Sequence, residues 1–293
     1  METNIRCGIT LGDCAGIGPE IVDLALKSGR LPDGVEYRIV GKYPACSLGK
    51  PTTETALAAG AALEESVALA QRGELEAIVT GPIHKARMYR AGFKFPDQTE
   101  FFARRCDIKN FAMCLTSKKL TVALVTRHVP LSEVSSALTQ NEIVRVGLLL
   151  AEFLHRRRIN SPRIAVAGLN PHAGESGKIG REENEIIAPA VQELQRICGA
   201  ASMFSGPYSP DTIFHRATQG DFDAVLCMYH DQGLIPLKLL AFHDGVNVTL
   251  GLPFPRTSPD HGTAFEIAGK GIARADSMIA AITLAVDLAR RKK

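Results

Sequence analysis

The stretch AVLCMYHDQG, residues 224–233, shows the pattern on which the fold prediction depends. Its first half, 224–228, is apolar, and its second half, 229–233, is polar or glycine. A short run that is apolar throughout is typical of a strand covered by helices on both faces. We therefore predict a buried strand that ends at a polar loop, which is where sites form in open α/β sheets.

Similar apolar runs alternate with helical stretches along the whole chain. The predicted strands are 7–11, 37–40, 77–80, 121–126, 163–167, 224–228 and 246–250. Helices are predicted at 53–72, 139–158 and 277–291. Thr139 and Glu142 have the spacing of a capping box, and Gly73 follows the first of these helices as a C-terminal cap. This alternation predicts an α/β fold with a mainly parallel sheet.

Length and charge limit the class of protein. The 293 residues exceed one typical domain, so two lobes are expected. No apolar run approaches the roughly 20 residues of a membrane span, and no secretory signal is recognised, so a cytoplasmic protein without a membrane partner is expected. The net charge is only +3, and the basic clusters at 155–158 and 290–293 close predicted helices, so no nucleic-acid partner is expected.

Six polar stretches that contain glycine or proline follow the predicted strands or turns. They are 12–19, 81–85, 127–130, 170–175, 230–238 and 260–264. Because the carboxyl ends of parallel strands meet at one edge of a sheet, these stretches are predicted to form one large site.

Three of the eight histidines share this position just past an apolar strand: His128, His172 and His230. Three neutral imidazoles with open positions suit Zn²⁺ or a similar cation in a catalytic role. Spacing alone leaves the alternative of three unrelated capping or core histidines, because ligands separated by dozens of residues form no local signature.

Three other stretches each allow two interpretations. The glycine-rich residues 12–20 either bring backbone N–H groups to an anion or cofactor, or form a structural turn; they lack the GxGxxG spacing of a Rossmann fold. Lys238 and Arg256, predicted on successive loops with the amide of Asn247 between them, either bind a phosphate or carboxylate or are solvated. The loop 260–264 either holds an adenosine or begins a helix.

Seven motifs, in order along the chain, resemble the family of 4-hydroxythreonine-4-phosphate dehydrogenase. They are ITLGDCAGIGPEIV (9–22), IVTGPIHKA (78–86), TEFFA (99–103), RHVPL (127–131), GLNPHAGE (168–175), MYHDQGLIPLK (228–238) and VNVTLGLPFPRTSPDHGTA (246–264). The resemblance implies a two-lobed fold similar to isocitrate and isopropylmalate dehydrogenases, with lobes 1–125 plus 251–293 and 126–250. It also implies an active site in the interlobe cleft and a homodimer whose interface completes each site.

The resemblance also implies roles for particular residues. The ligands of a divalent metal (Zn²⁺, Mg²⁺ or Co²⁺) would be His128, His172 and His230, with a partner chain contributing to each site. Substrate contacts would be Gln98, Thr99, Lys238, Asn247 and Arg256. Contacts to NAD or NADP would be His261, Gly262, Thr263 and Ala264. Asp231, next to an implied ligand, is a candidate catalytic base or orienting partner, and Lys238 is a second catalytic candidate.

The chain departs from the family pattern at three positions. Gln98 stands where the family usually has histidine, Cys14 where it favours proline, and His84 where it favours asparagine. A glutamine can donate a hydrogen bond to phosphate or carboxylate but cannot carry positive charge. The first departure therefore bears on the identity of the substrate more than on the type of reaction.

The expected activity is the NAD(P)-dependent, metal-dependent oxidation of 4-phosphooxy-L-threonine (4-hydroxythreonine 4-phosphate). Decarboxylation to 3-amino-2-oxopropyl phosphate would follow, in pyridoxal phosphate biosynthesis. One alternative is a sister dehydrogenase acting on threonate or erythronate 4-phosphate or on a cis-dihydrodiol carboxylate. A remote alternative is a metabolite-binding or acyl-phosphate-transferring protein, which would need neither three histidines nor a nicotinamide loop.

Overall fold

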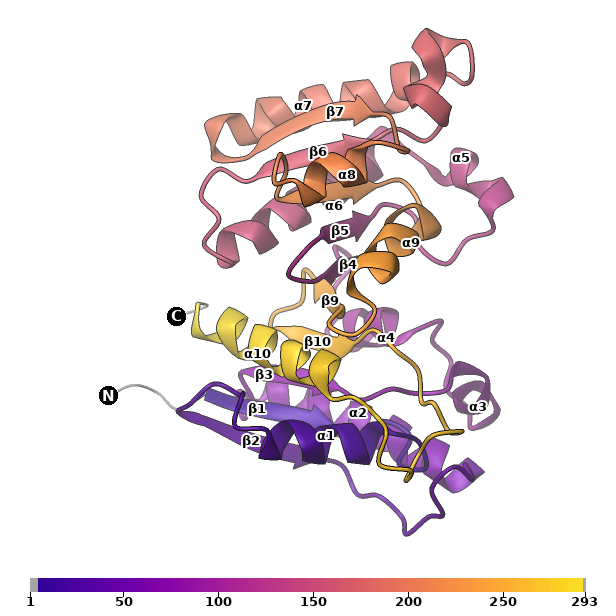
Figure 1. Ribbon diagram of the computed structural model, residues 1–293, viewed down its shortest axis with the longest axis vertical. Helices are drawn as coiled ribbons and strands as arrows, with labels where there is room; N and C mark the ends of the chain where they lie inside the picture. The colour runs from indigo at the N-terminus through magenta and orange to yellow at the C-terminus, as the bar shows by residue number, and fades with distance from the viewer. Residues whose placement is uncertain (1–4, 292–293) are drawn as a thin grey trace. The chain divides into compact units, whose positions relative to one another are not determined.

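The computed structural model describes residues 5–291 and contains two compact units (Figure 1). Unit 1 consists of Met1–Lys109 and His243–Lys293, and unit 2 is Asn110–Phe242. The last two residues of the basic cluster 290–293 lie outside the described residues. The sequence placed the two boundaries later, after residues 125 and 250, so it assigned residues 110–125 to the first lobe and 243–250 to the second.

Within the described part of unit 1, the strands follow the order β2-β1-β3-β10-β9. Their bounds are β1 Ile5–Thr10, β2 Val35–Val40, β3 Ala77–Thr80, β9 Val246–Leu250 and β10 Arg256–Pro259. All neighbours are parallel except β9 and β10. Strand β9 belongs to this unit because it pairs with β10. For this reason unit 2 ends at Phe242 rather than at the expected residue 250.

Helices cover both faces of the unit 1 sheet. Helix α10 (Asp276–Arg290) contacts β1, β3, β9 and β10 and packs beside α1 (Gly18–Lys27), whereas α2 (Thr53–Gln71) contacts β1, β2 and β3 and packs beside α3 (Lys85–Arg90). Figure 1 shows α1 and α10 in front of the strands and α2 behind them. The short α4 (Gln98–Arg105) carries the buried pair Phe101 and Phe102.

Within unit 2, the strands follow the order β4-β5-β8-β6-β7. The strands are β4 Ala112–Thr116, β5 Thr121–Leu124, β6 Arg163–Ala167, β7 Met203–Tyr208 and β8 Ala224–Cys227. Strands β4 and β5 form an antiparallel hairpin, and the other neighbours are parallel. Because the whole hairpin belongs to unit 2, this unit begins at Asn110 rather than at the expected residue 126.

Two layers of helices enclose the unit 2 sheet. Helices α6 (Gln140–Arg156) and α7 (Ala188–Cys198) pack on each other, and α8 (Ile213–Thr218) and α9 (His230–Ala241) contribute to a core with β4, β5, β6 and β8. The short α5 (Val134–Ala137) lies between β5 and α6 in the chain. Buried strands covered on both faces are the arrangement that the apolar runs predicted, and the predicted α/β class is confirmed.

Three strands of the structure were not predicted from the sequence. Strand β10 has the polar sequence RTSP yet is buried along its length, because β3 and β9 flank it. Strand β7 contains Gly206 and Pro207, which usually mark turns. Strand β4 reaches the sheet through the hairpin with β5.

The predicted helix starts are confirmed in part. Thr139 accepts a hydrogen bond from the backbone N–H of Glu142 at 3.2 Å, but the carboxylate of Glu142 pairs with Arg145. The reciprocal capping box occurs instead at α2, where Thr52 and Thr55 each accept a bond from the other's backbone. In the part of the chain that the structure describes, no helix combines the length and the apolar character that crossing a membrane requires.

The glycine-rich turn between β1 and α1 packs backbone against backbone. A Cβ atom at Gly12 would lie 2.1 Å from the carbonyl oxygen of Pro82, and one at Gly18 would lie 1.8 Å from that of Leu11. The N–H of Asp13 donates to the same Pro82 oxygen at 3.0 Å. These contacts support the structural interpretation of the turn.

We expect Gly18→Ala to lower the free energy of unfolding by more than about 2 kcal/mol, because the methyl group would overlap a backbone atom that cannot move aside. The matched control is Gly60→Ala inside α2, where the new Cβ would lie 3.6 Å from Met88 and helix propensity favours alanine by up to about 1 kcal/mol. Urea denaturation of both variants tests this. Equal stability of the two variants would contradict the packing argument.

Candidate active site

Two of the three predicted metal ligands lie side by side in unit 2. His128 follows β5, and His230 is the first residue of α9, directly after β8. Since β5 and β8 pair in parallel, with Leu124 opposite Cys227, their carboxyl ends hold the two segments together. The imidazole centroids are 5.4 Å apart and the ring planes are inclined by 44°.

A carboxylate orients one of these rings. The Nδ1 atom of His230 lies 2.6 Å from Oδ1 of Asp231, and the histidine side chain is about one-third exposed. A histidine that ligates a metal usually makes such a bond through its other ring nitrogen, which fixes the tautomer. The arrangement suits His230 to bind a cation through Nε2.

His172 lies in a segment with unusual backbone geometry. From His172 to Ser176 every residue has a positive φ, between 45° and 78°, so the chain makes a left-handed turn. The imidazole is exposed, and its Nδ1 lies 3.1 Å from Glu175. Over residues 5–291, no group of three or more His, Cys, Asp or Glu side chains is placed to hold a metal. The single chain therefore brings together two of the three predicted ligands.

Two of the predicted substrate residues of unit 1, Arg256 and Gln98, are hydrogen-bonded to each other. Arg256, on β10, is 2% exposed. Its Nη2 donates to the hydroxyl of Thr80 at 2.5 Å and to Oε1 of Gln98 at 2.7 Å, and its Nη1 donates to Thr249 at 3.3 Å. The guanidinium carbon lies 5.3 Å from the ring centroid of Phe102. The sequence placed Arg256 in a loop, but a strand and three polar side chains hold it in the core.

This arginine has capacity for a further partner. Its Nε has no hydrogen-bond acceptor among the described residues. Likewise, no described residue donates a hydrogen bond to Oδ1 of Asn247, on the adjacent strand β9. Burial lowers the pKa of Arg256 to about 10, while the charge of Asp97 raises it. The guanidinium therefore keeps its charge at neutral pH, with only neutral oxygen atoms as hydrogen-bond acceptors.

Gln98 supports this arginine with both ends of its amide. Besides accepting from Arg256, it donates from Nε2 to the carbonyl oxygen of Gly81 at 3.3 Å. The sequence allowed the amide to donate to a substrate anion, but in the structure that donor faces the backbone. Thr99, which is 1% exposed, is the hydrogen-bond acceptor for the hydroxyl of Thr249 at 3.3 Å.

The remaining predicted residues divide between the units. Lys238 lies in the last turn of α9, in unit 2, and Asn247 lies on β9, in unit 1. Asn247 lies on the strand that the sequence predicted at 246–250, whereas Lys238 lies in a helix rather than in the predicted loop.

The predicted cofactor segment 261–264 packs against the glycine-rich turn. The carbonyl oxygen of Thr263 accepts from the N–H of Ile17 at 2.9 Å, and a Cβ at Gly16 would come within 2.6 Å of that oxygen. Ala264 has a φ of 42°. His261 lies 3.1 Å from the carbonyl oxygen of Gly262. The turn thus holds the segment through backbone contacts that only glycine permits.

The six predicted polar stretches therefore form two groups. In unit 1, 12–19 contacts 81–85 and 260–264 through backbone hydrogen bonds. In unit 2, 127–130, 170–175 and 230–238 follow three strands of one sheet.

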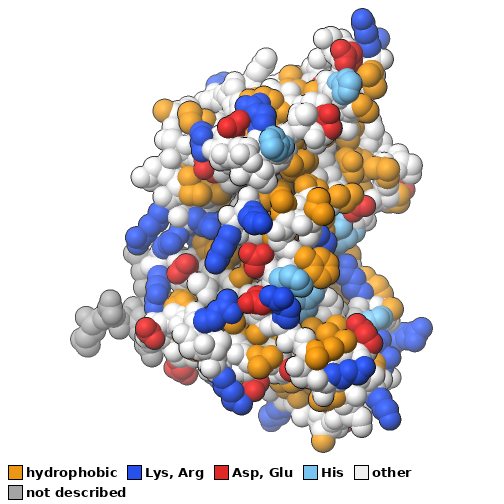
Figure 2. Space-filling view, viewed as in Figure 1, with side chains coloured by type: hydrophobic (Ala, Val, Ile, Leu, Met, Phe, Trp, Pro, Cys, Tyr) orange, Lys and Arg blue, Asp and Glu red, His pale blue; other side chains and the backbone are white. Residues whose placement is uncertain are grey.

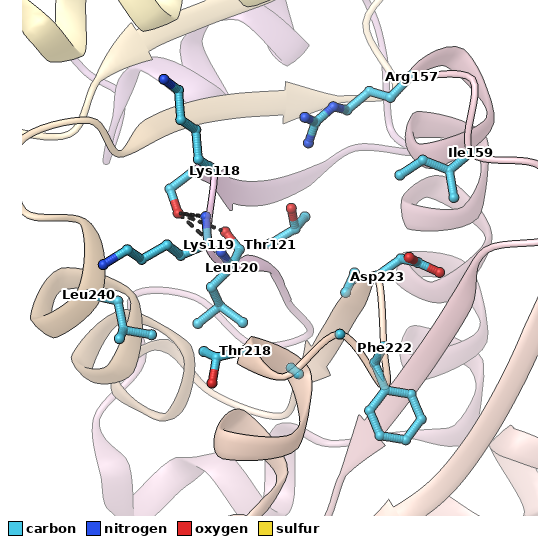
Figure 3. A pocket seen from close by; sticks show the side chains of 14 residues that line it. Lys118, Lys119, Leu120, Thr121, Arg157, Ile159, Thr218, Phe222, Asp223 and Leu240 are labelled. Carbon is cyan, nitrogen blue, oxygen red and sulfur yellow. Dashed lines mark hydrogen bonds between the residues drawn. The ribbon is translucent and has the colours of Figure 1, made fainter.

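A cavity of about 580 Å³ opens elsewhere in unit 2, at the amino ends of β5 and β8 (Figure 3). Its lining includes Leu120 before β5 and Asp223 before β8, with basic side chains such as Arg157 beside them. Because His128 and His230 follow the carboxyl ends of the same strands, this cavity is separate from the histidine pair.

Sequence reasoning missed several residues that hold the site together. They are Thr80, Phe102, Glu183, Gln232 and Thr249, all buried. A polar residue at the end of an apolar run was the available signal for Thr80, but it does not show which partner the side chain meets.

The fold is similar to that of a solved β-decarboxylating dehydrogenase. The solved structure of such an enzyme from Thermococcus kodakarensis is 16% identical, with a TM-score of 0.56, and the match covers 97% of this chain and 83% of that chain. At this identity, the likeness shows the fold alone.

The chain belongs to the family of the pyridoxal phosphate biosynthetic protein PdxA, whose profile matches residues 23–285. A 4-hydroxythreonine-4-phosphate dehydrogenase of Bradyrhizobium diazoefficiens is 48% identical over 290 residues, covering 97% of this chain and 83% of the relative. The structure of a putative 4-hydroxythreonine-4-phosphate dehydrogenase from Salmonella typhimurium is 37% identical with a TM-score of 0.82, covering 98% and 100% of the two chains. A terephthalate 1,2-cis-dihydrodiol dehydrogenase from Burkholderia xenovorans is 25% identical with a TM-score of 0.69, covering 97% and 98%. The predicted family is confirmed.

We expect Thr80→Val to lower the free energy of unfolding by about 1–3 kcal/mol, because the buried guanidinium of Arg256 loses an acceptor where water cannot replace it. In the background of Arg256→Met, the same change should cost much less. A double-mutant cycle measured by denaturant unfolding gives the coupling. Additive effects of the two changes would show that the hydrogen bond contributes nothing to stability.

Proposed function

We propose that the protein is a dehydrogenase dependent on NAD(P) and a divalent metal that acts in pyridoxal phosphate biosynthesis. It would oxidise 4-phosphooxy-L-threonine, followed by decarboxylation to 3-amino-2-oxopropyl phosphate. The observation that carries the proposal is the 48% identity to a dehydrogenase named for this substrate, over nearly the whole chain. The pair formed by His128 and His230 supports it, because imidazoles suit a catalytic cation.

The proposed cation ligands are His128, His172 and His230. A divalent cation held there would lower the pKa of the substrate hydroxyl and withdraw electrons during loss of CO₂. Asp231 is engaged with Nδ1 of His230, so we assign it the task of orienting that ring rather than of removing a proton.

The substrate's anionic groups would bind to the cationic side chains Arg256 and Lys238. Arg256 is already fixed by three neutral acceptors, so little conformational entropy remains to be lost when it binds an anion. Asn247, whose buried Oδ1 lacks a donor in the described structure, would accept a hydrogen bond from the substrate. NAD or NADP would contact the segment 261–264, whose backbone the glycine-rich turn holds.

A second candidate function is the sister reaction on threonate or erythronate 4-phosphate or on a cis-dihydrodiol carboxylate. The observation that favours it is Gln98, whose amide is engaged at both ends where the family usually has a histidine. A substrate group next to residue 98 would then contact a neutral amide rather than a charged side chain. The identity of only 25% to the dihydrodiol dehydrogenase makes this the weaker candidate.

We also propose that the chain forms a homodimer through the outer face of α9. Ile235, Leu239 and Phe242 are 66%, 85% and 69% exposed, although all three are large and apolar. Figure 2 has the same view as Figure 1, and hydrophobic side chains gather in it at the place that α9 occupies in Figure 1. An exposed apolar patch of this kind is typical of an interface, and it begins one turn after His230. A partner bound there would lie close to the histidine pair.

EDTA treatment should abolish NADH formation from 4-phosphooxy-L-threonine, and added Zn²⁺, Co²⁺ or Mg²⁺ should restore it. His172→Ala should remove metal binding while leaving the circular dichroism spectrum and melting temperature nearly unchanged, because the side chain is exposed. The same absorbance assay with threonate 4-phosphate and a cis-dihydrodiol carboxylate separates the two candidates. Full activity of the variant in EDTA would refute the metal assignment.

Leu239→Glu should shift the protein from dimer to monomer in light scattering after gel filtration, because a carboxylate would be buried in an apolar interface. Leu57→Glu is the control, since Leu57 is 52% exposed on α2 in the other unit. A wild-type protein that is monomeric at micromolar concentration would rule out the dimer proposal.

A further inference from the structure

Beyond the ligands themselves, we propose that Gln232 and Glu183 act as positioning residues for the proposed cation site. Their buried side chains fix the three histidine segments relative to one another and thereby set the affinity and geometry of cation binding. The inference rests on the proposed function, because it assumes that His128, His172 and His230 are ligands.

Gln232 joins two strand ends through its amide. The side chain is 6% exposed, two residues after His230. Its Oε1 accepts from the backbone N–H of Met228, the residue that follows β8, at 2.7 Å. Its Nε2 donates to the carbonyl oxygen of Gly168, the residue that follows β6, at 2.7 Å. Every change in the position of this amide would therefore move the start of α9 relative to the chain that leads to His172.

Met228 extends the connection to the third segment. Its carbonyl oxygen accepts from the backbone N–H of Thr126 at 3.1 Å and from the hydroxyl of Thr126 at 2.8 Å. Thr126 lies two residues before His128. The backbone N–H of Met228 thus bonds to the side chain of Gln232, and its carbonyl oxygen bonds to Thr126 in the segment that leads to His128.

Glu183 holds the segment that carries His172. Its carboxylate is 2% exposed and accepts from the backbone N–H groups of Leu169 and Asn170, both at 2.7 Å, and from Nδ2 of Asn170 at 3.0 Å. A Cβ at Gly174 would lie 2.5 Å from Oε2, so the carboxylate is packed closely against the turn itself.

The left-handed turn explains why such a support is needed. Four residues other than glycine have positive φ between His172 and Ser176, and each costs on the order of 1 kcal/mol relative to a right-handed conformation. A strained segment persists only where its surroundings hold it. The bonds from Leu169 and Asn170 to Glu183 fix the chain directly before the turn, and Gln232 fixes Gly168 before that.

The three histidines therefore belong to one continuous buried network. It runs from Thr126 through Met228 and Gln232 to Gly168, and from there along the chain to the segment that Glu183 holds. Partners that orient metal ligands typically change metal affinity by about 10–100-fold when they are removed. Here the partners orient the backbone that carries the ligands rather than the imidazole rings.

The test uses Co²⁺ as the probe, because its visible absorption reports the geometry of its ligands. The variants are Gln232→Met, which removes both amide bonds at similar size, and Glu183→Gln, which removes the negative charge. Matched controls are Gln219→Met and Glu185→Gln, both exposed residues of the same unit. We expect the dissociation constant for Co²⁺ to rise about 10–100-fold in the two variants with a changed visible spectrum, and to stay within about twofold in the controls.

A purely structural role would lower the melting temperature but leave the Co²⁺ affinity and spectrum of the folded protein unchanged, and that result would overturn the inference. If Gln232→Met does not fold, Gln232→Glu keeps an acceptor for the N–H of Met228 and replaces the donor to Gly168 by a carboxylate oxygen, so the same measurements are made on that variant. Wild-type protein that binds no Co²⁺ would instead contradict the proposed function.

Discussion

Helices cover both faces of each sheet, and this burial of the strands constrains everything else in the molecule. A strand enclosed in this way can hold few polar side chains, so polar groups concentrate where the strands end. The histidine pair follows β5 and β8, and Thr80, which receives the guanidinium of Arg256, is the last residue of β3. Burial of the strands therefore determines where the polar side chains of the candidate site lie.

The class of fold and the position of the histidines could be predicted because both depend on local patterns. The run 224–228 followed by His230 shows a buried strand and its polar end without any reference to the rest of the chain. The placement of Arg256 could not be predicted in this way. Its strand is polar and becomes buried only because β3 and β9 lie on either side, and pairing between distant segments leaves no mark in a short stretch.

The supporting residues illustrate the same limit. Gln232 follows a predicted ligand by two residues, and its sequence position favours a solvent-exposed amide at the start of a helix. Its role comes from the hydrogen bond to Gly168, which is 64 residues away in the chain. The two residues meet because β6 pairs with β8. Glu183 likewise resembles the exposed glutamates around it, yet it is the one that receives the backbone of residues 169 and 170.

Under the proposed function, the buried guanidinium of Arg256 would link the stability of unit 1 to the binding of the substrate anion. A charge that has only neutral hydrogen-bond acceptors is costly to bury, and an anion that binds beside it offsets part of this cost. The unfolded chain has no such site, so an anion would bind the native state selectively and shift the folding equilibrium toward it. The concentration of an anionic metabolite in the cell would then influence how long each molecule of the enzyme survives proteolysis as well as how fast it turns over.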